Sequence, residues 1–418
     1  MLQEDIMPIV KETISVSIKR NTHRGFIGWS GCDSICMDMQ DCQEMCRRLL
    51  EAGRCMEALE ASAYILVSGV KLASHADSSS GLLTEVVLST MKLTEACTKE
   101  IAGQEKKMRD KALAMLIKEA RKKAFDGWTE WRYGLLKCGI CLCDGKSAEK
   151  LENALDILLE GIEEDCFPEY KRKEDWLVRY YLHRHLLGKE AVRTELYDHI
   201  GIKEFCIIAI RDAMESGDFD EAERLCLDKA EAEERRYYRK NDPEDWNNLL
   251  FQVYERAGDT EKQMMQAKKL LLFGNEKFWE VLKQIHEANG TWKSVYQGLL
   301  EELKDSRQGI CYRTILIDEN EKERLMEDVE GNPYDLFYYG GLLAEEYPER
   351  IYVLCDTVIR QQCAEAKDRR EYRKVAKQIA QLIKWGGEDT AQKLIGELMQ
   401  AYPRRLALAD ELKKLEKA

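Results

Sequence analysis

Gly217-Asp-Phe-Asp-Glu-Ala222 is the stretch that decides the fold, because Gly258-Asp-Thr-Glu-Lys-Gln-Met264 repeats its pattern. In both, an apolar helical pattern ends at a glycine, an acidic residue follows, and a new helical pattern begins a few residues later. Glycine suits the left-handed residue that ends a helix, and aspartate can cap the next helix. Similar turns surround Gly53, Gly290 and Gly386. The pattern predicts helices joined in pairs by short turns.

The spacing of these turns indicates repeats. Gly217 and Gly258 are 41 residues apart, and Gly258 and Gly290 are 32 apart. Such intervals are typical of helical-hairpin repeats of the tetratricopeptide (TPR) class. A single hairpin cannot bury its apolar side alone, so neighbouring hairpins must stack. We therefore predict an all-α protein, a superhelical array of helical hairpins that forms a TPR-like α-α solenoid.

The turns become more regular in the second half of the chain. We predict an N-terminal helical region over residues 1–200 and a C-terminal TPR-like repeat region over residues 201–418. Two short apolar runs, Ile315–Ile317 and Tyr352–Leu354, could be strands between helical patterns. The segment from about Asp305 to Asp335 is expected to be a long loop.

The composition excludes several classes of protein. Of 418 residues, 44% are hydrophobic and 34% charged, which provides material for a core and argues against a disordered chain. The 6 prolines are few, and this favours long helices over a sandwich or barrel. No apolar run approaches about 18 residues, so we expect neither a membrane span nor a secretion signal. The expected location is the cytoplasm.

The net charge of −13 disfavours a protein that binds nucleic acid or an anionic membrane over its whole surface. The charge is uneven, however. Residues 366–418 contain 13 Lys/Arg against 8 Asp/Glu, and residues 105–123 contain 8 against 3. Solvated helix faces are the simplest interpretation of both regions, and a partner-binding role is the alternative.

Fifteen cysteines lie mostly within apolar helical patterns, so we interpret them as reduced and buried. Cys32, Cys36, Cys42 and Cys46 fit one helix, and their span of about 21 Å is too long for a single zinc ion. Three thiols are also close in Cys138-Gly-Ile-Cys141-Leu-Cys143. A metal there needs a fourth ligand, Cys166 or a histidine. Packed thiols are the favoured interpretation, and we expect no cofactor.

Two further motifs carry little chemistry. Gly145-Lys146-Ser147 resembles the end of a phosphate loop, but the spacing from Gly139 is one residue too long. Asp144 and Ser147 are better explained as the cap of the next helix. His183 and His185 lie two residues apart and would point to different sides of a helix, and His286 lacks a second histidine at a metalloprotease spacing.

Aromatic and basic clusters are the remaining candidates for binding. Large aromatic residues of helical hairpins usually fill the space between stacked helices, as we expect for the cluster of Trp128, Trp131 and Tyr133 and for the cluster of Tyr334, Phe337, Tyr338 and Tyr339. A groove for a partner peptide is the less favoured alternative for these clusters. The possible partner-binding residues are Tyr334, Tyr338, Arg369, Arg370, Arg373 and Lys374. Other basic residues that could touch phosphates are Lys118–Lys123, Lys377, Arg404 and Arg405.

Several segments, in their order along the chain, resemble the helical region that follows the zinc finger in bacterial SWIM zinc-finger proteins. They are His23–Trp29, Leu49–Gly53, Ala58–Glu60, Asp77–Leu82, Ala96–Cys97, Phe125–Trp128, Tyr402–Arg405 and Asp410–Leu415. The family's finger is a CxC pair followed by CxH. Cys141-Leu-Cys143 supplies a CxC, but no cysteine stands two residues before a histidine. The finger is therefore absent, and its binding activity is not implied here; either it precedes Met1 or this is a finger-less relative.

These observations leave three functional hypotheses. The first is a non-enzymatic scaffold that mediates protein–protein interaction within a SWIM zinc-finger system, with a protein partner that the sequence does not identify. The second is a nucleic-acid-binding accessory module that uses the basic helix faces. The third is a metal protein or enzyme that uses Cys138, Cys141 and Cys143, and it has the least support.

Overall fold

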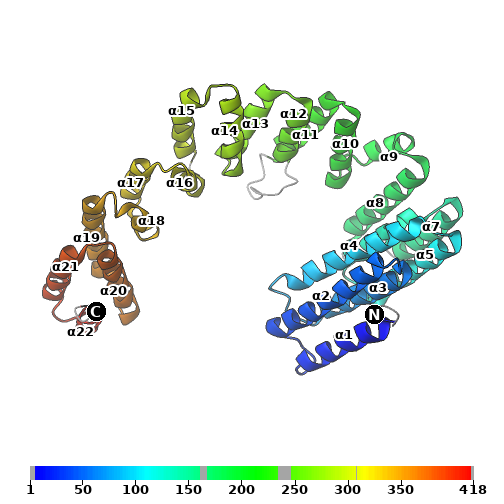
Figure 1. The fold of residues 1–418 in the computed structure, drawn as a ribbon, viewed down its shortest axis with the longest axis horizontal. Coiled ribbons are helices and arrows are strands. Elements are labelled where there is room, and N and C mark those ends of the chain that lie inside the picture. The colour runs from blue at the N-terminus through cyan, green and yellow to red at the C-terminus, as the bar shows by residue number, and fades with distance from the viewer. Residues whose placement is uncertain (1–4, 161–166, 234–245, 307, 416–418) are drawn as a thin grey trace. The chain divides into compact units, whose positions relative to one another are not determined.

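The computed structural model describes residues 5–160, 167–233, 246–306 and 308–415, and all the regular elements in these ranges are helices (Figure 1). They comprise 22 α-helices and four short 3-10 helices, beside two isolated β-bridges. Most helices pack against the next one along the chain. The predicted all-α class is confirmed, with sequential packing consistent with a helical array.

The chain forms two compact units, unit 1 (residues 1–216) and unit 2 (residues 217–418). The helices of unit 1 are α1 (Met7–Asn21), α2 (Trp29–Glu51), α3 (Cys55–Leu72), α4 (Leu82–Ala102), α5 (Lys106–Ala120), α6 (Thr129–Cys138), α7 (Gly145–Leu159), α8 (Pro168–Leu187), α9 (Arg193–Asp198) and α10 (Lys203–Ser216), with the 3-10 helices η1 (Lys123–Phe125), η2 (Ile140–Leu142) and η4 (Glu190–Val192).

The helices of unit 2 are shorter on average. They are α11 (Phe219–Glu233), α12 (Trp246–Ala257), α13 (Thr260–Leu272), α14 (Lys277–Ala288), α15 (Trp292–Asp305), α16 (Gly309–Asp318), α17 (Lys322–Gly331), α18 (Leu336–Leu343), α19 (Pro348–Glu365), α20 (Arg369–Lys384), α21 (Glu388–Ala401) and α22 (Leu406–Leu412), with the 3-10 helix η5 (Pro333–Asp335) before α18.

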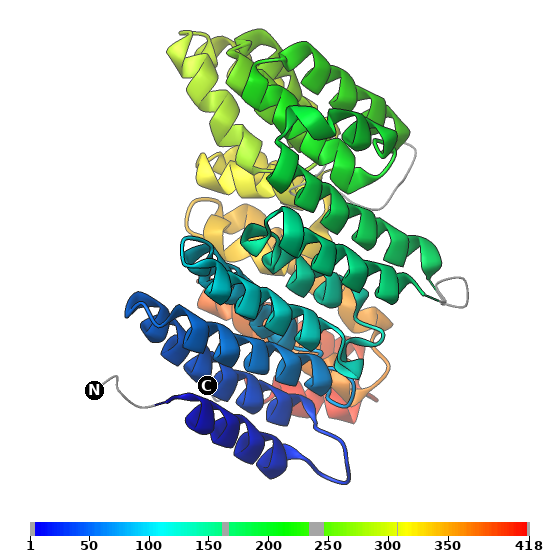
Figure 2. The same cartoon turned by 90° about the vertical axis from the view of Figure 1, so that its right-hand side faces the viewer.

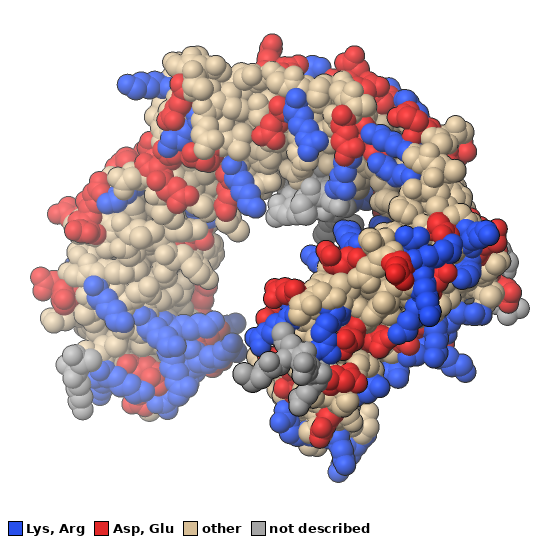
Figure 3. All heavy atoms as spheres, turned by 45° about the vertical axis from the view of Figure 1, so that its right-hand side comes forward, with Lys and Arg blue, Asp and Glu red and all other residues tan. Residues whose placement is uncertain are grey.

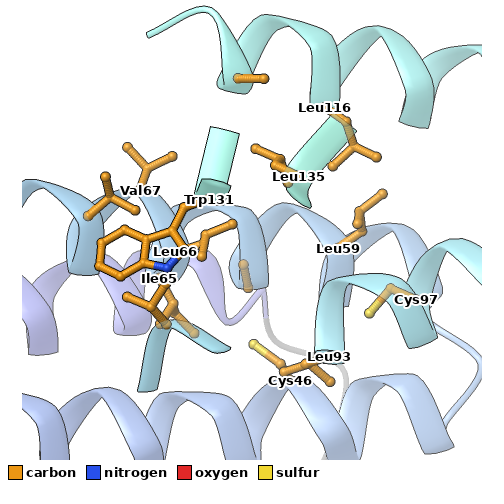
Figure 4. Close-up of a cluster of buried hydrophobic side chains, with 14 of the residues drawn as sticks. Cys46, Leu59, Ile65, Leu66, Val67, Leu93, Cys97, Leu116, Trp131 and Leu135 are labelled. Carbon is orange, nitrogen blue, oxygen red and sulfur yellow. The ribbon is translucent and has the colours of Figure 1, made fainter. Parts of the chain in front are cut away.

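The core of unit 1 is built around α3, whose neighbours are α1, α2, α4 and α5 (Figure 2). The helix is apolar on most of its circumference, and Leu59, Ile65 and Leu66 are completely buried. These side chains meet Leu93, Leu116, Leu135 and Trp131 from the surrounding helices (Figure 4). A helix that is hydrophobic all round must be enclosed on all sides, which explains its central place.

Unit 2 follows the turn pattern read from the sequence. Gly258, Gly290 and Gly386 have φ values of 70°, 68° and 87°, which confirms the predicted left-handed residue at the end of a helix. The next amide then bonds back into the helix, as Asp259 N does to the Tyr254 carbonyl. Asn320, with φ of 56°, takes the same place after α16. Asparagine tolerates this conformation, so the glycine pattern alone missed one of these turns.

Two predictions about local structure are wrong. Ile315–Ile317 belongs to α16 and Tyr352–Leu354 to α19, so neither run is a strand. The expected long loop from Asp305 to Asp335 instead contains α16 and α17. The apolar residues of these segments belong to helical patterns that polar residues interrupt, and short apolar runs do not distinguish strand from buried helix.

The cysteine predictions fare better. All 14 cysteines in the described ranges are free, and all except the half-buried Cys141 are buried. Cys32, Cys36, Cys42 and Cys46 lie on the single helix α2 as predicted. Cys166 lies outside the described residues. Among the helices that the structure describes, none has the length and apolar character needed to cross a membrane.

Candidate partner-binding surface

An exposed aromatic row runs along α18 and the 3-10 turn before it. Tyr334 lies in η5, and Tyr338 lies in α18 with Leu342 one turn after it on the same side of that helix. Their exposed fractions are 78%, 81% and 51%. The interpretation that the aromatic residues fill the space between helices is wrong for the two tyrosines. It holds for Phe337, whose ring stacks on Trp385 with centroids 6.0 Å apart.

A cationic row runs along the exposed side of α20. Its members are Arg370, Arg373, Lys374, Lys377 and Lys384, all exposed. At 100° per residue they fall within an arc of about 100° that contains no acidic residue. The row extends over about 21 Å. Figure 3 shows Lys and Arg side chains gathered over the C-terminal helices of unit 2.

The opposite side of α20 fixes the direction of this row. Tyr372, Val375, Ile379 and Leu382 are buried in the unit 2 core. Asp368 caps the helix by accepting a hydrogen bond from the Glu371 amide at 2.9 Å. The apolar and basic residues thus lie on opposite sides of α20, and burial of the apolar side leaves the cations in solvent.

Trp385, just beyond α20, holds α18 against that helix. Its indole covers Gly340 and Gly341, and a Cβ atom at Gly340 would lie 2.7 Å from the ring. The Trp385 carbonyl accepts a hydrogen bond from the Tyr352 hydroxyl at 2.8 Å. Glycine is therefore required at position 340 by the closeness of the indole rather than by backbone conformation.

A second contact shows that α18 and α20 run in parallel. Gln381 Nε2 donates to the Phe337 carbonyl at 3.4 Å, across 44 positions of sequence. Gly341 and Trp385 are also 44 residues apart and in contact. On α18, Phe337 and Gly341 lie beside the aromatic row, and on α20 Gln381 lies within the arc of the cationic row, so the two rows border the same contact. We call this surface the α18–α20 face, formed by Tyr334, Tyr338, Arg370, Lys374 and Lys377.

An ion-pair group behind α18 fixes the aromatic row. Arg313 of α16 bonds Asp328 of α17 at 2.5 Å and Asp335 of η5 at 2.8 Å, and all three side chains are largely buried. Its guanidinium also lies 5.7 Å from the Tyr339 ring centroid. Tyr339 follows Tyr338 directly, so this group holds the backbone that presents the exposed rings.

The structure separates the predicted basic residues into two groups. Arg369 bonds Glu411 of α22 at 2.9 Å, and Arg373 lies 3.6 Å from the same carboxylate. Arg405 donates to the Cys363 carbonyl at 2.7 Å and stacks on Tyr402. These three arginines are engaged within unit 2. Within the described structure, no ion pair or hydrogen bond engages the side chains of Arg370, Lys374, Lys377, Lys384 or Arg404.

The other basic stretch lies in unit 1, at the end of α5 and the start of η1. Lys118, Arg121, Lys122 and Lys123 are exposed, and Lys122 forms an ion pair with Glu119. No exposed large aromatic residue belongs to this stretch. It therefore has charge in common with the α18–α20 face but not the aromatic row.

Sequence reasoning missed a groove of about 360 Å³ between α13, α14 and α15. Its apolar lining includes Met264, Leu282 and Leu299, while Lys268 and Glu302 form an ion pair of 2.7 Å within it. Gly298 also lines it, and a Cβ atom there would have no neighbour within 4 Å. A glycine in an otherwise regular helical pattern was the one available signal.

The thiols of Cys138, Cys141 and Cys143 take part in packing. Each lies within 3.7 Å of a backbone carbonyl, that of Met91, Cys138 or Gly139 respectively. Burial raises the pKa of Cys138 and of Cys143 to about 12, so both thiols stay protonated and poorly nucleophilic at neutral pH. In the described ranges, no three His, Cys, Asp or Glu side chains are placed to hold a metal ion.

The remaining motifs have structural roles. Asp144 caps α7 by accepting from the Ser147 amide at 3.0 Å, while the Ser147 hydroxyl accepts from the Asp144 amide at 2.7 Å, which confirms the predicted cap. His183 contacts Glu195 and Glu152, whereas His185 faces the Cys143 carbonyl. The two histidines thus point to different sides, as predicted.

His286 lines the groove between α13, α14 and α15, with Nδ1 2.9 Å from the Thr291 hydroxyl. Burial, and then the charge of Lys268, lowers its pKa. The side chain is therefore kept neutral at physiological pH and acts as a polar point in an apolar lining.

Comparison of the chain with protein-family models, with curated proteins and with solved structures returns no match.

Proposed function

We propose that the chain is a TPR-like superhelical array of helical hairpins that acts as a non-enzymatic scaffold for a protein partner. The packing of unit 2 carries this proposal, because most helices there contact mainly their neighbours in sequence. Such packing leaves one side of every hairpin in solvent, and helical arrays use that side for binding. The unreactive state of the buried thiols also supports a binding role over a catalytic one.

The groove between α13, α14 and α15 is the proposed protein-binding site. It combines apolar walls with a charged pair, Lys268 and Glu302, and Met265 at its edge is 68% exposed. Methionine adapts its shape to different partners, and apolar contacts surrounded by polar groups are typical of protein interfaces. The expected occupant is the apolar side of a helix or short peptide whose flanking charges meet this pair.

Filling the groove tests the proposal. Gly298→Trp should abolish photo-crosslinking of a partner from a reactive residue placed at Met265, because the indole would occupy the open space. Gly396→Trp on α21 is the matched control, since a Cβ atom there also has no neighbour within 4 Å. Equal crosslinking by both variants would contradict a protein-binding groove, and circular dichroism would verify that both remain helical.

We further propose that the scaffold belongs to a SWIM zinc-finger system. The order of the short segments from His23–Trp29 to Asp410–Leu415 is the support for this relation. We expect to find the zinc finger, a CxC pair followed by CxH, in one of two places. It is encoded either in the same native reading frame or in the protein that crosslinks at the groove. Elemental analysis of the purified chain should detect no stoichiometric zinc. If it detects zinc, and the zinc disappears when Cys138, Cys141 and Cys143 are substituted, the chain is a metal protein instead.

A further inference from the structure

We propose that the α18–α20 face binds single-stranded nucleic acid. The face combines two features that such ligands need together, a row of cations for the phosphates and exposed rings on which bases can stack. Arg370, Lys374 and Lys377 supply the first, and Tyr334 and Tyr338 supply the second. This site is separate from the groove between α13, α14 and α15, so it stands or falls independently of the protein-binding proposal.

The cations are arranged to contact a chain of phosphates. Along the helix, Lys374 lies about 6 Å beyond Arg370, and Lys377 lies about 4.5 Å beyond Lys374. Arg370, Lys374 and Lys377 engage no other side chain in the described structure, so their charges are available to a ligand. Three acids lie near this end of α20: Asp368 and Glu371 accept hydrogen bonds from backbone amides, and Glu411 is paired with Arg369 and Lys414. The local field therefore attracts an anion despite the net charge of −13.

The tyrosines distinguish single strands from other anionic partners. Their exposed fractions of 78% and 81% leave the ring faces open to a planar base. In a duplex the bases are stacked inside and the rings would have nothing to bind. An acidic peptide would use the cations but has no planar groups that require two open rings in one row. Tyr334 in η5 and Tyr338 in α18 are four residues apart in sequence, so the two rings can each take one base.

The backbone beneath the rings is held in place. Trp385 packs on Gly340 and Gly341, and Arg313 ties η5 to α17 through Asp335 and Asp328. The rings therefore need little ordering when a ligand arrives, which lowers the entropic cost of binding. Leu336 and Leu343 of α18 are buried in the unit 2 core, whereas Tyr334 and Tyr338 are exposed and contribute little to that packing.

Fluorescence anisotropy of the full chain with a labelled 15-nucleotide oligothymidylate or oligouridylate tests the proposal. The expected result is binding that weakens steeply with salt and exceeds binding to a duplex of equal length. Replacing Arg370, Lys374 and Lys377 together by Gln should weaken binding at least about tenfold and reduce the salt slope by roughly 2, since each phosphate contact on a single strand contributes about 0.7. Lys118→Gln, Arg121→Gln and Lys123→Gln together give a control with the same change in net charge and unchanged binding.

The tyrosine variants separate stacking from simple charge attraction. Tyr334→Ser with Tyr338→Ser should weaken binding by about 5- to 150-fold per ring, whereas Tyr334→Phe with Tyr338→Phe should leave it unchanged. All four substitutions are at exposed positions and should preserve the fold. Three results would overturn the proposal: no binding at low salt, equal binding of duplex and single strand, or tyrosine variants that bind like the wild type. Competition by a poly-glutamate peptide that depends on the same rings would assign the face to a protein instead.

Discussion

Units 1 and 2 bury their helices in different ways. In unit 1, α3 is enclosed by α1, α2, α4 and α5, and Leu59, Ile65 and Leu66 are completely buried inside this group. In unit 2, a helix such as α20 buries one stripe and leaves the opposite side to solvent. The first arrangement concentrates stability in a shared core. The second distributes stability over neighbouring pairs and frees surface for binding.

The largest effect is expected from removing a core side chain of unit 1. Leu66→Ala should cost about 2–5 kcal/mol of unfolding free energy, because the side chain is fully buried and its neighbours belong to several helices. Hydrogen exchange should then accelerate across α1 to α5 together. Urea denaturation followed by exchange with mass spectrometry measures both the size and the extent of the loss.

Leu394→Ala on α21 is the matched substitution in unit 2, where the leucine is equally buried. Its loss of protection should be confined to α19 to α22, since α21 contacts only these helices appreciably. Protection of α12 to α14 should not change. If Leu394→Ala loosened all of unit 2, or Leu66→Ala loosened α3 alone, the proposed difference between the units would be wrong.

Gly340→Ala should have the next largest effect. The added methyl group would lie 2.7 and 2.8 Å from carbons of the Trp385 ring, so the indole or α18 must move, at a cost of about 1–3 kcal/mol. Gly396→Ala on α21 is the control, because nothing lies within 4 Å of its new methyl group. This control should gain up to about 1 kcal/mol from better helix propensity. Thermal unfolding monitored by tryptophan fluorescence compares the two, and equal stabilities would show that Trp385 does not hold α18 closely.

The fold class was accessible from the sequence because glycine turns and helical periodicity are local signals. The left-handed glycines at 258, 290 and 386 carry the pattern directly. Asn320 shows the limit of this glycine pattern. It takes the same left-handed conformation as the glycines, so a search for glycines does not find the turn between α16 and α17. The enclosed position of α3 depends on which helices surround it, and this is not encoded in any one segment.

The candidate surface was predictable only in part. Tyr334, Tyr338, Arg370 and Lys374 were found as clusters of residue types, but their presence on one face depends on the contact of Trp385 with Gly340 and Gly341. Arg369 looked equivalent to Arg370 in the sequence, yet it is bound to Glu411, which lies 42 positions away. The groove between α13, α14 and α15 is lined from three helices, and Gly298 was its one signal in the sequence.

Helix caps give a smaller effect that again compares the units. Asp144→Ala removes the cap of α7 in unit 1, and Asp368→Ala removes that of α20 in unit 2. Each should cost about 0.5–2 kcal/mol of unfolding free energy. Exchange should accelerate in the first turn of α20 in the second variant and spread to α22, which packs on that end. If hydrogen exchange accelerated over equally many helices in both variants, stability would not be more local in unit 2 than in unit 1.

The smallest effect concerns the ion pairs of Glu411. Lys414, and then Arg369, hold the pKa of this carboxyl near 2, below the value of about 4.3 in an unfolded chain. A lowered pKa means that the unfolded state binds the proton more readily, so the contribution to stability is complete above about pH 4.3 and disappears as the pH falls towards 2. Glu411→Gln should therefore lower the melting temperature at pH 7, and its difference from the wild type should narrow below about pH 4.5. Glu388→Gln, an exposed change at the start of α21, should show no such convergence. A difference that stayed constant down to pH 3 would mean that packing, rather than charge, gives Glu411 its role at the junction of α20 and α22.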